Sequence, residues 1–219
     1  MVKVVCISDT HCRLRDVNVP DGDILVHAGD LTFQGTVGEI SQELRELGRI
    51  AKRFKAVYII AGNHDWLGEY NSSLMRQMCK DVGVIYLQDD WAVFEGLVIY
   101  GSPWQPEFCD WAFNLPRGEK LAEKWAQIPD KVDILVTHGP PAKILDVVPY
   151  DKEHVGCEDL FTRVMQVKPQ LHVFGHIHHS YGVQQFDGVT FVNASVSTEQ
   201  YKPTNTPIVI ELEAIAEAP

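Results

Sequence analysis

Short apolar runs separated by amphipathic stretches limit the fold more than any other feature of this chain. The apolar runs have the length and composition of buried strands, and they lie at residues 2–7, 24–28, 56–60, 84–87, 97–100, 134–137 and 171–174. Apolar side chains at helical spacing predict helices over residues 39–54, 74–82, 119–128 and 158–167. The C-terminal third instead predicts antiparallel strands over residues 181–186, 189–193 and 208–212. Together these segments predict an α/β fold in which helices cover mixed β-sheets.

Length and composition predict one globular domain spanning residues 1–219, because the hydrophobic content of 45% can form a core of its own. The chain has 5 cysteines, an odd number without C-x-x-C spacing, which favours reduced thiols over a disulfide framework. The first residues lack the apolar core of a signal peptide, and no apolar run has the length of a membrane span. We therefore expect a cytoplasmic protein that does not contact membranes.

The net charge limits the class of partner. The chain carries 19 Lys and Arg against 30 Asp and Glu, a formal net charge of −11. A protein that binds long nucleic acids needs clustered basic residues to contact the phosphates, so we expect no such partner. A small anionic substrate remains compatible with this charge, and the sequence leaves the oligomeric state open.

Metal-capable side chains follow many of the expected strands directly. They are Asp9, His11, Asp30, Asn63, His64, Asp65, His138, His176 and His178. Ligand-binding residues of open α/β sheets gather outside the carboxyl ends of the strands, so we expect these side chains to converge. The mixture of imidazole, carboxylate and amide donors suits Mn, Fe, Zn, Co or Ni better than Mg or Ca. Two such ions side by side can activate water and bind the oxygens of a phosphoryl group.

The succession D-x-H, GD, GNHD, H and GHxH is similar to that of the calcineurin-like metallophosphoesterase superfamily. The segments GSPWQPEF, WAFNLPRG, DILVTHGPP, LHVFGHIH and PTNTPI further resemble the metallophosphoesterase domain-containing (MPPED-type) branch, and the resemblance runs from Val4 to Leu212. It implies a four-layer αββα sandwich with mixed β-sheets and two divalent transition metal ions. Mn²⁺ is the expected ion, with Fe, Zn, Co or Ni as alternatives.

The resemblance also implies a role for each residue of the motifs. The first metal would be held by Asp9, His11, Asp30 and His178, and the second by Asp30, Asn63, His138 and His176. Asp30 would bridge the two ions, and a hydroxide between them would attack the phosphorus in line. His64 would protonate or stabilise the leaving oxygen. Asp65 would fix the tautomer and orientation of His64, or it would cap the following helix. Some members of the branch carry glycine in place of His176, so its presence here favours an active enzyme.

Residues 101–118 are rich in aromatic side chains and lack a strand or helix pattern, so we expect a packed lid. Its aromatic residues, Trp104, Trp111 and Phe113, would either hold the lid together or provide a face on which a nucleobase stacks. Arg117 would contact substrate or pair with a lid carboxylate. The candidate substrate-binding residues are Trp104, Phe113, Asn114, Arg117 and His179. We expect His27, His154 and His172 to pack or form hydrogen bonds outside the site.

These observations predict a metal-dependent phosphodiesterase acting on small phosphate diesters, with cyclic nucleotides such as 2′,3′-cyclic species as candidate substrates. The expected ligands include only two carboxylates, so two divalent ions would leave the site positively charged. One alternative is a phosphomonoesterase or protein phosphatase, although the segment after the GNH motif has no arginine before Arg76. The other alternative is a non-catalytic module that binds a nucleotide.

Overall fold

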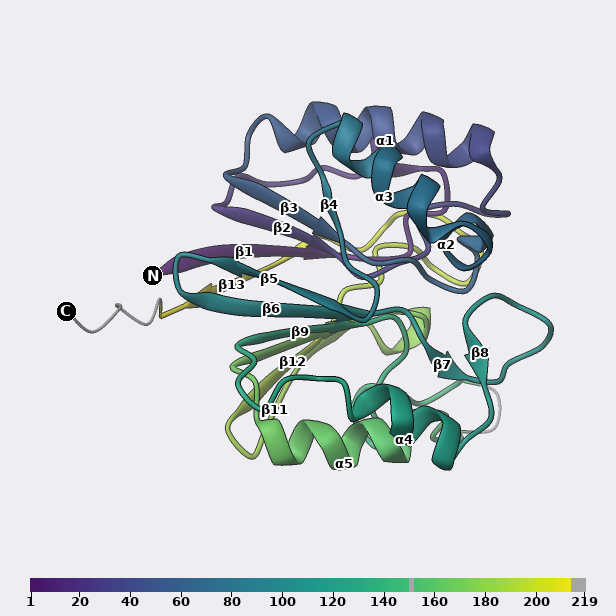
Figure 1. Cartoon of the computed structure of the whole chain (residues 1–219), viewed down its shortest axis with the longest axis vertical. Helices are drawn as coiled ribbons and strands as arrows, with labels where there is room; N and C mark the ends of the chain where they lie inside the picture. Colours follow the sequence, from purple (N-terminus) through teal and green to yellow (C-terminus); the bar gives the residue numbers. More distant parts are fainter. Residues whose placement is uncertain (150–151, 214–219) are drawn as a thin grey trace.

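The computed structural model of the protein describes residues 1–149 and 152–213. Two β-sheets pack face to face, and helices cover the outer face of each sheet (Figure 1). Helices α1 (Val37–Ala51), α2 (Trp66–Tyr70) and α3 (Ser72–Asp81) lie over the first sheet. Helices α4 (Glu119–Trp125) and α5 (Glu158–Val167) lie over the second sheet.

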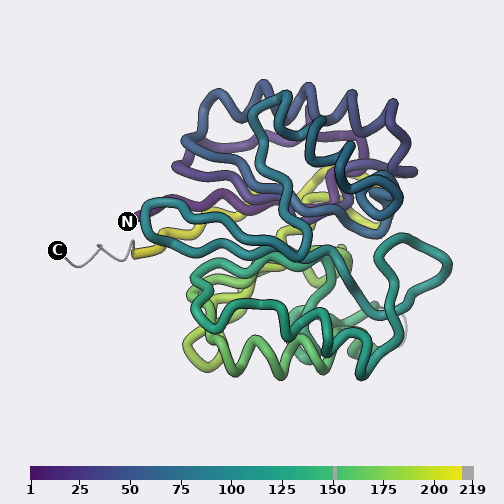
Figure 2. Tube along the Cα trace, viewed as in Figure 1, coloured from purple at the N-terminus to yellow at the C-terminus, as the bar shows by residue number. Residues whose placement is uncertain are grey.

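The first sheet has 5 strands in the order β13-β1-β2-β3-β4. Strands β1 (Val2–Ile7), β2 (Ile24–His27), β3 (Ala56–Ile59) and β4 (Ile85–Tyr86) are parallel, and β13 (Ile208–Leu212) pairs antiparallel with β1. In Figure 2, the N-terminal part of the chain forms this sheet, the middle part forms the second sheet, and the yellow C-terminal strand lies beside the purple β1. The first sheet is therefore completed by a strand from the far end of the sequence.

The second sheet has 6 strands in the order β11-β12-β10-β9-β6-β5. Its central strands β6 (Leu97–Ser102), β9 (Ile134–Thr137), β10 (Leu171–Phe174) and β12 (Val189–Asn193) are parallel. The edge strands β5 (Asp90–Phe94) and β11 (Gly182–Phe186) pair antiparallel with their neighbours. A separate 2-stranded sheet, β7 (Gln105–Pro106) with β8 (Asn114–Leu115), lies within the expected lid.

Three apolar clusters fill the spaces between the four layers. In β1, Val5 and Ile7 face the helices of the first sheet, whereas Val4 and Cys6 face the second sheet. This alternation follows from the two-residue period of a strand. The third cluster lies between the second sheet and the helices α4 and α5. The arrangement confirms the predicted four-layer αββα sandwich with mixed β-sheets.

The sequence predicted most elements within one to three residues, but it missed several short ones. The edge strand β5 was not predicted, because its side chains alternate between exposed and half-buried positions rather than forming an apolar run. The short helix α2, the short pair β7 and β8, and the 3-10 turns η1 (Leu14–Asp16) and η2 (His178–Ser180) were also missed. In the part of the chain that the structure describes, no helix is long and apolar enough to cross a membrane.

Candidate metal centre

The strands of both sheets bring their carboxyl ends to one edge of the sandwich. Asp9, Asp30 and Asn63 follow β1, β2 and β3 of the first sheet, and His138 and His176 follow β9 and β10 of the second. Backbone hydrogen bonds hold the loops in register, with Asp9 N donating to Gly29 O (2.9 Å) and Gly175 N to His138 O (2.9 Å). Residues from distant parts of the sequence therefore face one another across this edge.

Asp9, His11 and His178 form one group of converging ligand atoms. The Nε2 atoms of the two histidines lie 3.3 Å apart, and His178 Nε2 lies 3.2 Å from Asp9 Oδ1. In each ring, Nδ1 forms a hydrogen bond to a backbone carbonyl. His11 Nδ1 lies 3.2 Å from Thr32 O, and His178 Nδ1 lies 3.0 Å from Thr198 O. A carbonyl oxygen can only accept, so both Nδ1 atoms donate, and both Nε2 atoms face the same space beside Asp9. Two imidazole nitrogens and a carboxylate oxygen that converge in this way fit a metal ion.

A second group of ligand atoms surrounds Asp30. His138 donates Nδ1 to Ala28 O (2.9 Å), which leaves Nε2 at 2.9 Å from Asn63 Oδ1 and 3.4 Å from Asp30 Oδ2. Asp30 Oδ2 also lies 3.7 Å from His11 Nε2, so this carboxylate lies between the two groups. Carboxylate, amide and imidazole atoms thus converge on one point, and this donor set again fits a cation.

Within the described residues, three sets of metal-capable side chains have all ligand atoms within 4.8 Å of one another. They are Asp9 with His11 and His178, Asp9 with Asp30 and His138, and His11 with Asp30 and His64. His176 belongs to none of these sets. Its ring centroid lies 5.1 Å from that of His138, and its side chain lines the adjoining cavity.

The electrostatics keep both carboxylates ionised. Burial acts to raise the pKa of Asp9, but the histidines around it, first His178, hold that pKa well below its usual range. Burial likewise acts to raise the pKa of Asp30, but His138 lowers it more, so the pKa of Asp30 is also below its usual range. For His138, burial lowers the pKa and Asp30 raises it more, to about 9. Burial lowers the pKa of His11 to about 4, which keeps its ring neutral and able to bind metal.

Two glycines allow the carboxylates to lie against backbone. A Cβ on Gly62 would collide with Asp30 Oδ1, and a Cβ on Gly175 would collide with Asp9 Oδ2. The amide of His176 donates to Asp9 Oδ2 (3.1 Å), and the Ser195 hydroxyl donates to the same oxygen (2.8 Å). The glycines of the GNHD and GHxH motifs therefore make room for the acidic residues of other motifs.

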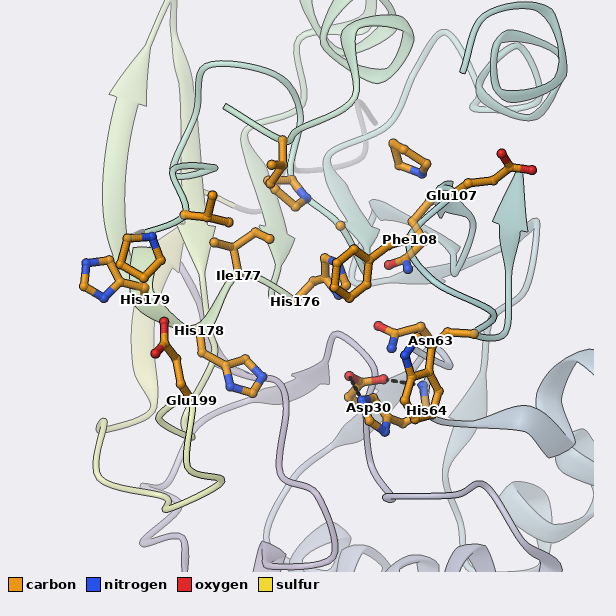
Figure 3. Close-up of a pocket in the computed structure, with 18 of the residues that line it drawn as sticks. Asp30, Asn63, His64, Glu107, Phe108, His176, Ile177, His178, His179 and Glu199 are labelled. Atoms are coloured by element: carbon orange, nitrogen blue, oxygen red, sulfur yellow. Dashed lines mark hydrogen bonds and ion pairs between the residues drawn. The ribbon is translucent and has the colours of Figure 1, made fainter. Parts of the chain in front are cut away.

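His64 lies beside Asp30 and Asn63 (Figure 3), and its ligand atom converges with those of His11 and Asp30. Its Nδ1 donates to Phe33 O at 2.7 Å, and its Nε2 lies 4.0 Å from Asp30 Oδ2. The indole of Trp111 covers the ring, with centroids 4.2 Å apart. The imidazole is therefore fixed with Nε2 toward the site.

The prediction that Asp65 orients His64 is wrong, because Phe33 O holds the Nδ1 of that ring. The buried carboxylate of Asp65 instead accepts from the amides of Leu31 (3.1 Å), Thr32 (3.0 Å) and Gly62 (2.9 Å), and from the Thr32 hydroxyl (2.7 Å). Asp65 stands at the N-cap of α2, but its side chain makes no capping hydrogen bond. Burial, followed by Asp30, raises the pKa of Asp65 to about 6. Its carboxylate therefore ties the loop after β2 to the loop after β3.

A cavity of about 420 Å³ adjoins the ligand atoms, and two of the candidate substrate-binding residues, Arg117 and His179, line it. Phe113 is fully buried in the apolar cluster under α1, and Trp104 packs edge-on against it. The Trp104 indole donates to Asp89 Oδ2 at 2.8 Å. These contacts contradict a stacking face made by Trp104 and Phe113 and agree with the alternative, in which they hold the lid together.

Asn114 and Arg117 also bond to protein groups. The Asn114 amide donates to Phe108 O (3.1 Å) and Cys109 O (2.8 Å), so it fastens the lid rather than lining the cavity. The Arg117 guanidinium donates to Gly156 O, Val155 O and Glu158 Oε2, each at 2.7 Å. Its carboxylate partner therefore lies at the start of α5 and not in the lid.

Sequence reasoning missed Tyr201, whose ring lies 4.7 Å from that of His11 and lines the cavity. Gln105 and Phe108 also line it. Tyr201 lies between β12 and β13 in a stretch without strand or helix periodicity, so no sequence signal placed it here. Phe108 lies beside His176 in Figure 3, with ring centroids 5.9 Å apart.

Residues 2–180 match the calcineurin-like phosphoesterase family. The chain belongs to this family. It is 44% identical over 234 residues to the human protein "Metallophosphoesterase domain-containing protein 1", covering 96% of this chain and 71% of the human one. This similarity confirms the MPPED-type branch.

Solved structures share the fold. The phosphopantetheinyl hydrolase of Mycobacterium tuberculosis matches with a TM-score of 0.63 and 19% identity, covering 94% of this chain and 95% of that one. The protein TT1561 of Thermus thermophilus matches with a TM-score of 0.62 and 12% identity, covering 88% of each chain. The family and the converging ligand atoms make this protein a metal-dependent phosphoester hydrolase that uses divalent ions.

Proposed function

We propose that the protein hydrolyses small phosphate diesters, with Mn²⁺ as its metal and cyclic nucleotides such as 2′,3′-cyclic species as candidate substrates. The observation that carries this proposal is the charge of the cavity wall. Among the described residues that line it, Arg117 is the only Lys or Arg, and Glu107 and Glu199 line it as well. The guanidinium of Arg117 already bonds two carbonyls and Glu158.

A phosphate diester carries one negative charge, whereas a monoester carries nearly two at neutral pH. The cavity wall therefore has little positive charge to neutralise the second negative charge of a monoester, and its carboxylates would repel that charge. The organic groups of a diester would instead contact apolar side chains such as Phe108 and Ile177 (Figure 3). The cavity volume of about 420 Å³ suits a molecule the size of a nucleotide.

We assign the metal ligands as the family resemblance implies. The first ion would be held by Asp9, His11, Asp30 and His178, and the second by Asp30, Asn63, His138 and His176. Divalent ions, when bound, supply activation of water and neutralisation of phosphoryl charge. The fixed Nε2 of His64 would hold a proton for the leaving oxygen. Asp9 and Asp30 stay ionised and so favour cation binding.

The test compares the Mn²⁺-loaded protein on bis(4-nitrophenyl) phosphate, 4-nitrophenyl phosphate and 2′,3′-cyclic AMP. We expect the larger kcat/KM on diesters and complete loss of turnover in a chelator. Asp30→Ala should abolish activity, whereas Asp21→Ala, a control at a side chain that is 83% exposed, should retain it.

Three outcomes would contradict the proposal. Turnover that survives metal removal would exclude a metal-dependent reaction. A preference for the monoester would identify a phosphomonoesterase. A protein that binds two ions but hydrolyses none of the three substrates would be a binding module.

A further inference from the structure

Gln105 presents a buried acceptor that no group of the described chain satisfies. Its residue is 1% exposed and lines the cavity beside the metal centre. Its Oε1 has no hydrogen-bond partner among the residues that the structure describes. Buried amide oxygens are rarely left unpaired, because the missing hydrogen bond costs free energy. This oxygen therefore needs a donor from outside the described chain.

Neighbouring contacts fix which end of the Gln105 amide is unpaired. Asn114 lies opposite Gln105 in the pairing of β7 with β8. The Asn114 amide nitrogen donates to the carbonyls of Phe108 and Cys109, which can only accept. Asn114 Oδ1 therefore faces Gln105, which donates its Nε2 at 3.3 Å. Rotating the Gln105 amide would bring two oxygens together, so Oε1 remains the free acceptor.

The position of this oxygen links it to the metal centre. Gly139 follows His138 directly, and both Gly139 and Gln105 line the cavity. A Cβ built on Gly139 would lie 3.9 Å from Gln105 Oε1. Because Gly139 has no side chain, nothing from that residue covers the acceptor. Gln105 therefore lies beside the residue that follows a proposed metal ligand, on the wall of the same cavity.

We propose that Gln105 is a specificity-determining residue that accepts a hydrogen bond from an O–H or N–H of the substrate's organic group. The proposal rests on the proposed diesterase function and narrows its substrate class. Phe108 and Ile177 line the same cavity, so the preferred substrate combines apolar surface with a hydroxyl or amino donor. A nucleoside has both features, whereas a plain aryl or alkyl ester lacks the donor.

The test compares two chromogenic diesters with the same 4-nitrophenolate leaving group. Thymidine 5′-(4-nitrophenyl phosphate) carries O–H and N–H donors, and bis(4-nitrophenyl) phosphate carries none. Gln105→Met keeps the size of the side chain and removes its amide. It should lower the ratio of the two kcat/KM values, thymidine ester over bis-ester, roughly 5- to 100-fold, as expected for a lost hydrogen bond to a buried group. Gln127→Met, at an exposed glutamine after α4, is the control and should leave the ratio unchanged.

Asn114→Ala should lower the same ratio, because Asn114 fixes the amide of Gln105. A ratio that stays within twofold of the wild-type value in Gln105→Met would overturn the inference, as would an equal fall on both substrates, which would indicate a structural role. If the wild-type protein hydrolyses neither diester, the proposed function fails, and the inference fails with it.

Discussion

Protonation of His172 should make the protein less stable in acid. His172 is fully buried, and its ring lies against Phe174 and Phe191, with centroids 5.1 and 5.7 Å apart. The Thr137 hydroxyl donates to Gly139 O, so the same oxygen accepts from His172 Nε2 at 2.9 Å. His172 Nδ1 has no partner among the described residues. A second proton would therefore place an unpaired charge in the core.

The magnitude follows from the shifted pKa. Burial lowers the pKa of His172 from 6.5 to about 3. Between these values the unfolded chain binds the proton and the folded protein does not, so stability falls as the pH drops below 6.5. Integrating the linkage relation gives a loss of about 2 kcal/mol at pH 5 relative to pH 7.5 from this residue alone.

The assay is urea unfolding at pH 7.5 and pH 5, with chelator present throughout. His172→Phe fills the site with another aromatic ring and removes the titration. Its free energy of unfolding should fall about 2 kcal/mol less than that of the wild type between the two pH values. His179→Phe removes an exposed imidazole and should behave like the wild type. Equal losses in the wild type and His172→Phe would refute the reasoning.

Three further predictions concern the loops around the site. Gly175→Ala should weaken Mn²⁺ binding roughly 10- to 100-fold by calorimetric titration, because the new Cβ would displace Asp9; unchanged affinity would contradict this. Asp65→Ala should lower the free energy of unfolding by about 3 kcal/mol or more, because the buried amides of Leu31, Thr32 and Gly62 would lose their hydrogen-bond acceptor. A loss below 1 kcal/mol in urea unfolding would argue that water replaces the carboxylate. His64→Gln should lower kcat/KM roughly 10²- to 10⁴-fold with the metal content intact, and less for 4-nitrophenyl esters than for alkyl esters; loss of metal would instead identify His64 as a ligand.

The sequence predicted the features that depend on local pattern. The bounds of β1, β9 and β10 follow from uninterrupted apolar runs, and the residues after them meet because parallel strands end at one edge. The order of the motifs along the chain predicted that Asp9 and His138 share one site, and their ligand atoms converge with that of Asp30.

Tertiary contacts decided what the sequence did not predict. Asp65 bonds to the amides of Leu31 and Thr32, which lie 34 and 33 residues earlier, and no local pattern records such a contact. In the irregular lid, the sequence could not distinguish the core residue Phe113 from Trp111, which covers His64. The role of Gln105 depends on its neighbour Asn114 across a two-residue strand pair, too short to leave a periodic signal.

Metal content measured on the purified protein decides whether the clustered side chains form a dinuclear centre. After loading with Mn²⁺ and gel filtration, elemental analysis should find about two ions per wild-type chain and fewer than one in Asp30→Ala, because Asp30 lies between both ligand groups. A wild-type chain that retains no ion, or an Asp30→Ala chain that still retains two, would contradict the proposed centre.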